Sequence, residues 1–147
     1  MTDPFELQRF VDAQAPLYAQ VMSELRNGRK RSHWMWFVFP QIAGLGHSAM
    51  AHRYSIASCD EALAYLEHPT LGPRFRECTQ TVCAIEGRSL AEIFGSPDDL
   101  KFRSSMTLFE AVSGDPVFRH ALDKFYAGAN DSATLAILKK QAPLEGS

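Results

Sequence analysis

The residues best suited to chemistry gather in one short stretch of this 147-residue chain, residues 28–41. Three consecutive cations and a histidine run there into both tryptophans, and a glutamine follows. Cationic side chains bind anions through charge-assisted hydrogen bonds, and an apolar floor with a few converging polar groups is typical of a small-molecule pocket. We expect a catalytic role for His33 and ligand-binding roles for Lys30, Ser32, Trp34, Trp36 and Gln41.

A second candidate group lies on a predicted helix over residues 97–113. Asp98, Lys101 and Ser105 are spaced by three, four and seven residues, so they share one stripe of the helix, with Ser104 beside it. A carboxylate, a cation and a hydroxyl on one face can orient a polar ligand. We expect Asp98 and Lys101 to be catalytic and both serines to bind the ligand, in one pocket floored by a tryptophan.

Both groups also have a structural interpretation. Cations at 29–31 are favoured beside the C-terminal end of a helix dipole, and Asp98 with Lys101 can form an exposed ion pair worth at most about 0.5 kcal/mol. The sequence therefore leaves two hypotheses. One is a site for a small anionic ligand, with or without an enzymatic reaction. The other is a non-enzymatic interaction module, whose aromatic run is core and whose basic triplet docks a partner.

The remaining reactive side chains predict no metal site and no cofactor. His47 and His52 are five residues apart, a spacing that suits neither a helical ligand pair nor a short loop. The three cysteines, Cys59, Cys78 and Cys83, form no ligand pattern and indicate reduced thiols in a cytoplasm.

Charge and hydropathy exclude two classes of partner. A net charge of −2 gives no general attraction to nucleic acid or to anionic membranes, and the longest apolar run, 34–39, is too short to span a bilayer. We expect a cytoplasmic protein whose partner is a small anionic molecule, with no membrane partner and no nucleic acid; the oligomeric state stays open.

Helix signals recur along the chain and must position these side chains. Asp3-Pro4 with Glu6 predicts the start of a first helix, and Asn27-Gly28 the end of a second. A capping box at 58–61 opens a third. The clearest helix is 71–86, where one face carries five apolar residues: Leu71, Phe75, Cys78, Val82 and Ile85.

Further helices are predicted at 97–113, after Asp115-Pro116, and from Asp131 or Ser132 with Leu135 and Leu138 inside. The aromatic run can be read as a strand or as a short helix capped by Ser32; we favour the helix, because no second strand is available to pair with it. Residues 42–56 are expected to be a loop and 89–94 a turn. The predicted fold is all-α: a compact, single-domain orthogonal bundle of six to eight helices over 1–142, with a frayed tail at 143–147.

Several runs resemble the signature of a bacterial family catalogued only as a domain of unknown function, family 1810. The most specific are Lys30-x-Ser32-His33-Trp34-Met35-Trp36-Phe37-x-Phe39-Pro40-Gln41 and Asp98-Asp99-x-Lys101-x-x-Ser104-Ser105-Met106-Thr107-Leu108-Phe109. The resemblance covers almost the whole chain and implies an all-helical fold, but it brings no established reaction. Some members carry the label calpastatin, which implies a disordered inhibitor; a hydrophobic fraction of 46% indicates a globular protein instead.

A shorter stretch, Leu7-Gln8-Arg9-Phe10-Val11-Asp12-Ala13-Gln14, is similar to the NADAR N-glycosidases, which act on ADP-ribose-type nucleosides. The chain departs from that family at Gln8, where an acidic residue would precede the aromatic pair. This resemblance implies a nucleotide-like ligand such as an ADP-ribose derivative and, if the chain is an enzyme, a hydrolase of the N-glycosidase type.

Overall fold

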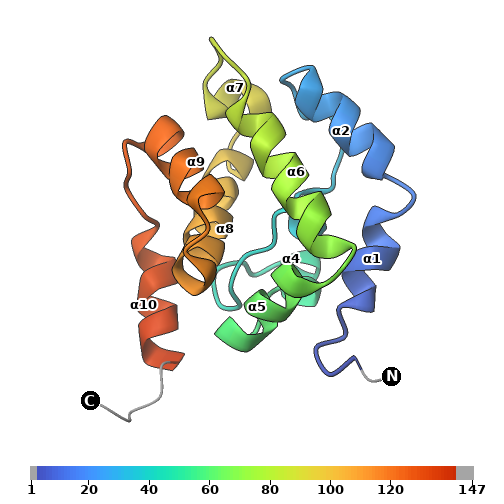
Figure 1. Cartoon of the computed structure of the whole chain (residues 1–147), viewed down its shortest axis with the longest axis vertical. Coiled ribbons are helices and arrows are strands. Elements are labelled where there is room, and N and C mark those ends of the chain that lie inside the picture. Colours follow the sequence, from blue (N-terminus) through green and yellow to red (C-terminus); the bar gives the residue numbers. More distant parts are fainter. Residues whose placement is uncertain (1–2, 142–147) are drawn as a thin grey trace.

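Every regular element in residues 3–141, the part of the chain that this computed structural model describes, is a helix. The all-α prediction is confirmed, but the predicted number of helices is too low (Figure 1). The described helices are α1 (Gln8–Gln14), α2 (Tyr18–Arg26), α3 (Met35–Val38), α4 (Ala49–Arg53), α5 (Cys59–Glu67), α6 (Leu71–Cys83), α7 (Leu90–Phe94), α8 (Asp98–Ser113), α9 (Pro116–Tyr126) and α10 (Ser132–Gln141). The predicted tail at 143–147 lies outside the described residues.

Two short helices replace segments predicted to be irregular. The expected loop at 42–56 contains α4, where the Ser48 hydroxyl accepts the Ala51 N–H at 3.0 Å. The expected turn at 89–94 contains α7, which has a complete capping box between Ser89 and Glu92. Helices of one turn show too few apolar positions to reveal a period, so the capping serines are the signal that could have predicted them.

The aromatic run forms α3, a single turn, as the favoured interpretation requires. Its predicted cap is wrong, because Ser32 bonds to a carboxylate on α2 and Trp34 precedes the helix without a side-chain cap. An isolated parallel bridge between Ile42 and Ile56 then ties the two ends of the following segment together.

A local cap at the start of α1 and a tertiary contact at the end of α6 accompany boundaries that differ from the prediction. The Asp3 carboxylate accepts the N–H groups of Leu7 and Gln8, so α1 begins at Gln8, later than predicted. Helix α6 ends at Cys83 instead of 86, and the Lys124 ammonium of α9 donates to the carbonyl of this last residue and to the Ile85 carbonyl beyond it.

The last helix faces differently from the prediction. Leu135 was expected inside, but it is 38% exposed. Helix α10 instead turns Thr134, Ile137 and Leu138 toward the core, because the Asp131 carboxylate accepts both the N–H and the hydroxyl of Thr134 and so sets the rotation of the first turn.

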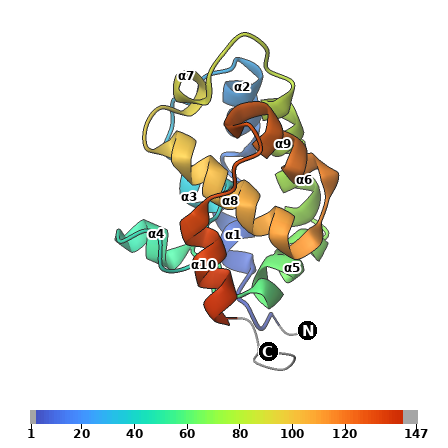
Figure 2. The ribbon, with the colours of Figure 1, turned by 90° about the vertical axis from the view of Figure 1, so that its left-hand side faces the viewer.

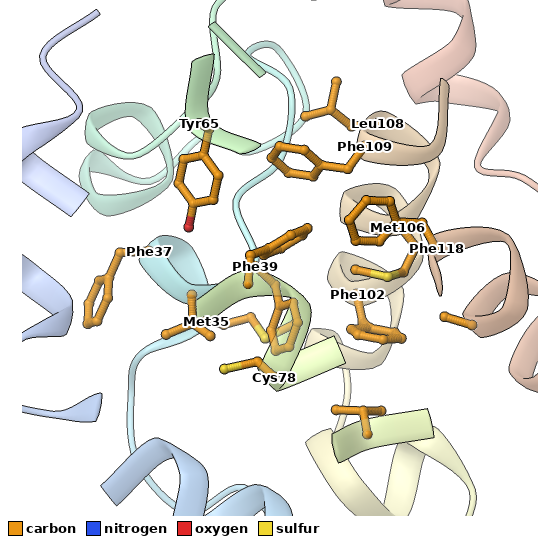
Figure 3. Close-up of a cluster of buried hydrophobic side chains, with 14 of the residues drawn as sticks. Met35, Phe37, Phe39, Tyr65, Cys78, Phe102, Met106, Leu108, Phe109 and Phe118 are labelled. Atoms are coloured by element: carbon orange, nitrogen blue, oxygen red, sulfur yellow. The ribbon is translucent and has the colours of Figure 1, made fainter. Parts of the chain in front are cut away.

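An aromatic cluster fills the centre (Figure 3). The Phe75 ring of α6 lies 4.4 Å from Phe109 and 5.3 Å from Phe118, between ring centroids, and Phe39 lies 5.0 Å from Phe102. Helix α8 supplies two of these rings and packs against α5, α7, α9 and α10. In Figure 2 it crosses the middle of the molecule, with α3 beside it. The N-terminal end of α8 is therefore fixed next to the aromatic run.

The periodic face of α6 gives a first prediction. Phe75 is 1% exposed, so Phe75→Ala should lower the free energy of unfolding by about 2–5 kcal/mol through the cavity it leaves. Urea denaturation measures this loss. The control is Gln80→Ala on the exposed face of the same helix, which should be nearly neutral. Equal stability of the two variants would mean that α6 does not bury this face.

Candidate functional site

The buried carboxylate of Glu24 on α2 holds the basic stretch in place. Its Oε1 accepts the backbone N–H groups of Arg31 at 2.8 Å and Ser32 at 3.1 Å, and the indole N–H of Trp34 at 2.9 Å. Its Oε2 accepts the Ser32 hydroxyl at 2.7 Å and the Gln20 amide at 3.0 Å. A side chain that is 7% exposed thus receives five hydrogen bonds, which fix the path of the chain between α2 and α3.

These hydrogen bonds also keep Glu24 ionised. Burial by itself would raise the pKa of Glu24, but the donors from Arg31, Ser32, Gln20 and Trp34 stabilise the charged form and lower the pKa to about 2. The negative charge is therefore a permanent part of the fold at neutral pH.

The three cations of the stretch point in different directions. The Lys30 side chain is only 8% exposed; its ammonium lies 2.9 Å from Asp98 Oδ2 and 5.2 Å from the centre of the Trp34 ring. Arg29 and Arg31, on either side of it in the chain, are exposed. The predicted basic triplet is thus split into one buried cation and two exposed ones.

Asp98 brings the two predicted groups of residues together. Its second oxygen lies 3.3 Å from the Lys101 ammonium, so two lysines share one carboxylate. The Lys101 ammonium in turn lies 5.5 Å from the centre of the Trp36 ring, within the range of a cation–π contact. Two positive charges against one negative charge leave this cluster with an excess of one positive charge.

A narrow pocket adjoins this cluster, between α3, α4 and α8. The volume of this cavity is about 20 Å³, which is enough for one water molecule. Three of the predicted residues line it: Trp36, Gln41 and Lys101. The other lining residues are Met35, Phe39, Ile42, Gly44, Gly46, Ala51, His52, Tyr54 and Ser55.

The other predicted site residues do not line this pocket. Trp34 is fully buried, with its indole N–H on Glu24, so it has no face for a ligand. His33 is exposed. Ser104 donates to the Leu100 carbonyl of its own helix. Ser105 is fully buried, and its hydroxyl has no partner within the described residues.

The polar residues that α4 and its flanks bring to the pocket were not predicted from the sequence. His52, Tyr54 and Ser55 lie in the segment expected to be a loop. The side of the pocket that these residues form depends on close packing between Gly46 and α4. A Cβ on Gly46 would lie 2.5 Å from the Ala51 Cβ, so only glycine lets the loop pack against α4. The serine cap at 48 was the available signal, whereas nothing around Glu24 in the sequence distinguishes it from an ordinary surface glutamate.

The buried thiols do not suit nucleophilic chemistry. Burial raises the pKa of Cys78 to about 12 and that of Cys83 to about 11, so both stay protonated near neutral pH, and a thiol reacts as its thiolate. Within residues 3–141, no cluster of three His, Cys, Asp or Glu side chains could hold a metal ion, and no helix has the length and apolar character needed to cross a membrane.

Comparisons with known proteins agree with this fold. The model of a family described as "Protein of unknown function (DUF1810)" matches residues 4–138. Among solved structures, the chain is similar to the conserved hypothetical protein Rv1873 from Mycobacterium tuberculosis, with 57% identity and a TM-score of 0.92; the match covers 93% of this chain and 99% of that one. A search of curated proteins finds no match.

The lowered pKa of Glu24 predicts an acid-sensitive stability. Glutamate in the unfolded chain titrates near 4.5 and in the fold at about 2, so the stabilisation is complete above the unfolded value and is lost as pH falls toward the folded one. Wild type should lose about 3 kcal/mol of unfolding free energy between about pH 5 and pH 2 through this group.

Urea denaturation across this pH range tests the assignment. Glu24→Gln should be less stable at neutral pH, because a neutral amide offers only one acceptor oxygen to the five donors, and its stability should vary less with pH. The matched control is Glu67→Gln, at the exposed end of α5, which should keep the wild-type pH dependence. Identical acid profiles for wild type and Glu24→Gln would contradict the role assigned to this carboxylate.

Proposed function

The chain belongs to the DUF1810 family, and on that premise we propose that it binds a small anionic ligand in the pocket beside Trp36 and Lys101. The observation that carries the proposal is the shared carboxylate: Asp98 is already paired with Lys30 at 2.9 Å, so it neutralises only part of the Lys101 charge. Lys101 therefore presents a partly exposed cation beside an aromatic face, which is a favourable place for an anion.

The dimensions of the pocket restrict how such a ligand would bind. The enclosed space accepts a group the size of one water. We propose that one charged oxygen of the ligand lies there against Lys101, where Gln41 and Ser55 offer hydrogen-bonding groups. A nucleotide-like ligand, such as an ADP-ribose derivative, would lay its remaining atoms over the rim formed by Trp36, because aromatic faces suit sugars and bases.

Binding has better support than hydrolysis. Among the described residues that line the pocket, His52 is a side chain of the type that serves as a general acid or base. The carboxylate of Asp98 reaches the pocket only through its ion pair with Lys101. An N-glycosidase-type reaction would need these groups, together with the exposed His33, to meet the ligand, and we propose it only as an additional activity of the same site.

One observation favours the alternative of an interaction module. Trp34 is fully buried and its indole N–H is used internally, so half of the predicted tryptophan floor is structural core. In that alternative the aromatic run only supports the fold, and no small anion stabilises the protein.

We also propose a reducing compartment, such as the cytoplasm, for this chain. Cys59, Cys78 and Cys83 are all free, and secreted domains of this size commonly pair their cysteines.

Thermal denaturation with a panel of anions tests the proposed function. The panel contains acetate, phosphate, ribose 5-phosphate, ADP and ADP-ribose. A ligand at ten times its Kd should raise the Tm of wild type by about 3–6 °C, because it binds only the folded state. Lys101→Met should lose the shift caused by acetate, phosphate and ribose 5-phosphate, since it keeps the alkyl chain over Trp36 but removes the charge.

The matched control is Lys140→Met, an exposed lysine on α10 without an ion pair in the described structure, which should respond like wild type. Chromatography of the incubated ADP-ribose would detect hydrolysis separately from binding. No Tm shift with any of the anions would favour the interaction module.

A further inference from the structure

A second hollow lies on the surface beside Arg29 and Arg31, apart from the pocket at Trp36. Its volume is about 420 Å³, within the range of small-molecule sites. It is lined by α2 and by the two connections that follow α2 and α6: Gln20, Ser23, Glu24, Asn27, Arg29, Arg31 and Arg88. Three arginines thus line one hollow.

Two of these arginines are available to a ligand. Arg29 and Arg31 are exposed, and within residues 3–141 their guanidinium groups have neither a hydrogen bond nor an ion pair. Their backbone is nevertheless fixed, because the Arg31 N–H donates to Glu24 and the Arg29 N–H to the Glu24 carbonyl. The two side chains are therefore free to reach an anion from a backbone that is already fixed.

The third arginine is already held in position. Arg88 donates from Nε to the Gly28 carbonyl at 2.9 Å and from Nη2 to the Glu92 carbonyl at 3.3 Å. A Cβ on Gly28 would lie 3.0 Å from the Arg88 Cδ, and Gly28 has a φ of +71°, so glycine both forms this turn and admits the arginine. The guanidinium group of Arg88 is therefore oriented before any ligand arrives.

The charge and the lining together indicate the class of ligand. Three arginines and the ionised Glu24 leave the hollow with a net charge of +2. The neutral lining groups are amides and a hydroxyl, and among the described residues no aromatic ring lines the hollow. A single carboxylate would occupy one guanidinium fork, whereas linked phosphoryl groups offer enough oxygens for several.

We propose that this hollow binds a diphosphate group, supplied as inorganic pyrophosphate or as the diphosphate of a nucleotide. Recognition is through the phosphoryl oxygens, with Arg29 and Arg31 as mobile donors and Arg88 as the oriented one. The site is independent of the pocket at Trp36, because Lys30, between the two arginines in sequence, points away to Asp98.

Titration calorimetry at low ionic strength tests this site with inorganic pyrophosphate, ADP and sulfate as probes. Pyrophosphate should bind wild type, and Arg29→Ala or Arg31→Ala should each weaken it about tenfold, the usual effect of losing one charge-assisted contact. The matched control is Arg26→Ala, an exposed arginine at the end of α2 that does not line the hollow; it should change the affinity less than about twofold. Unchanged Tm values verify that the variants fold.

Additional titrations distinguish binding at this hollow from binding at the pocket beside Lys101. Lys101→Met should keep pyrophosphate binding, so this site and the proposed pocket can fail independently. ADP binding as tightly as pyrophosphate, or more tightly, supports the diphosphate class and identifies the nucleotide as a source. The proposal is overturned if pyrophosphate does not bind, if Arg26→Ala weakens it as much as Arg31→Ala, if Lys101→Met abolishes it, or if sulfate binds equally well.

Discussion

The ionised carboxylate of Glu24, buried under five donors, is the constraint on which the rest of the structure depends. A buried charge is tolerated only when it is fully hydrogen-bonded, so the chain after α2 must bring four donors to this point, beside the one from Gln20 of α2. That requirement buries Trp34 and turns Lys30 toward Asp98. It also leaves Arg29 and Arg31 on the outside. The positions of both the pocket at Trp36 and the hollow of arginines depend on how the Glu24 side chain holds the connection between α2 and α3, residues 27–34.

The long helices could be predicted because their apolar residues repeat over several turns. The face of α6 that buries Phe75 and Val82 is the clearest case. The short helices α4 and α7 could not be predicted from a period, since one turn contains too few apolar positions. At the end of α6, the Cys83 carbonyl accepts a hydrogen bond from Lys124, which is 41 residues away. Contacts between distant segments fix such boundaries, and no local pattern records them.

The candidate site was predictable only in part, for a related reason. The spacing of Asp98 and Lys101 placed both on one helical face, and the ion pair between them is present. Neighbours in the aromatic run nevertheless separate: Trp34 enters the core, whereas Trp36 remains at the pocket. Trp34 precedes α3 with a non-helical backbone, whereas Trp36 lies within it, so the two side chains leave the chain in different directions. The side of the pocket that contains His52 comes from a segment whose apolar residues show no periodic spacing.

The different surroundings of the two indoles give this protein two internal optical probes. Trp34 is enclosed and hydrogen-bonded to a carboxylate, so its fluorescence reports on the integrity of the core. Trp36 is half-buried beneath an ammonium group at the edge of the pocket, so its emission is sensitive to whatever displaces water there. With only these two tryptophans in the chain, the difference in spectrum between wild type and Trp36→Phe isolates the second signal. Folding and occupancy of the pocket can thus be followed separately without an added label.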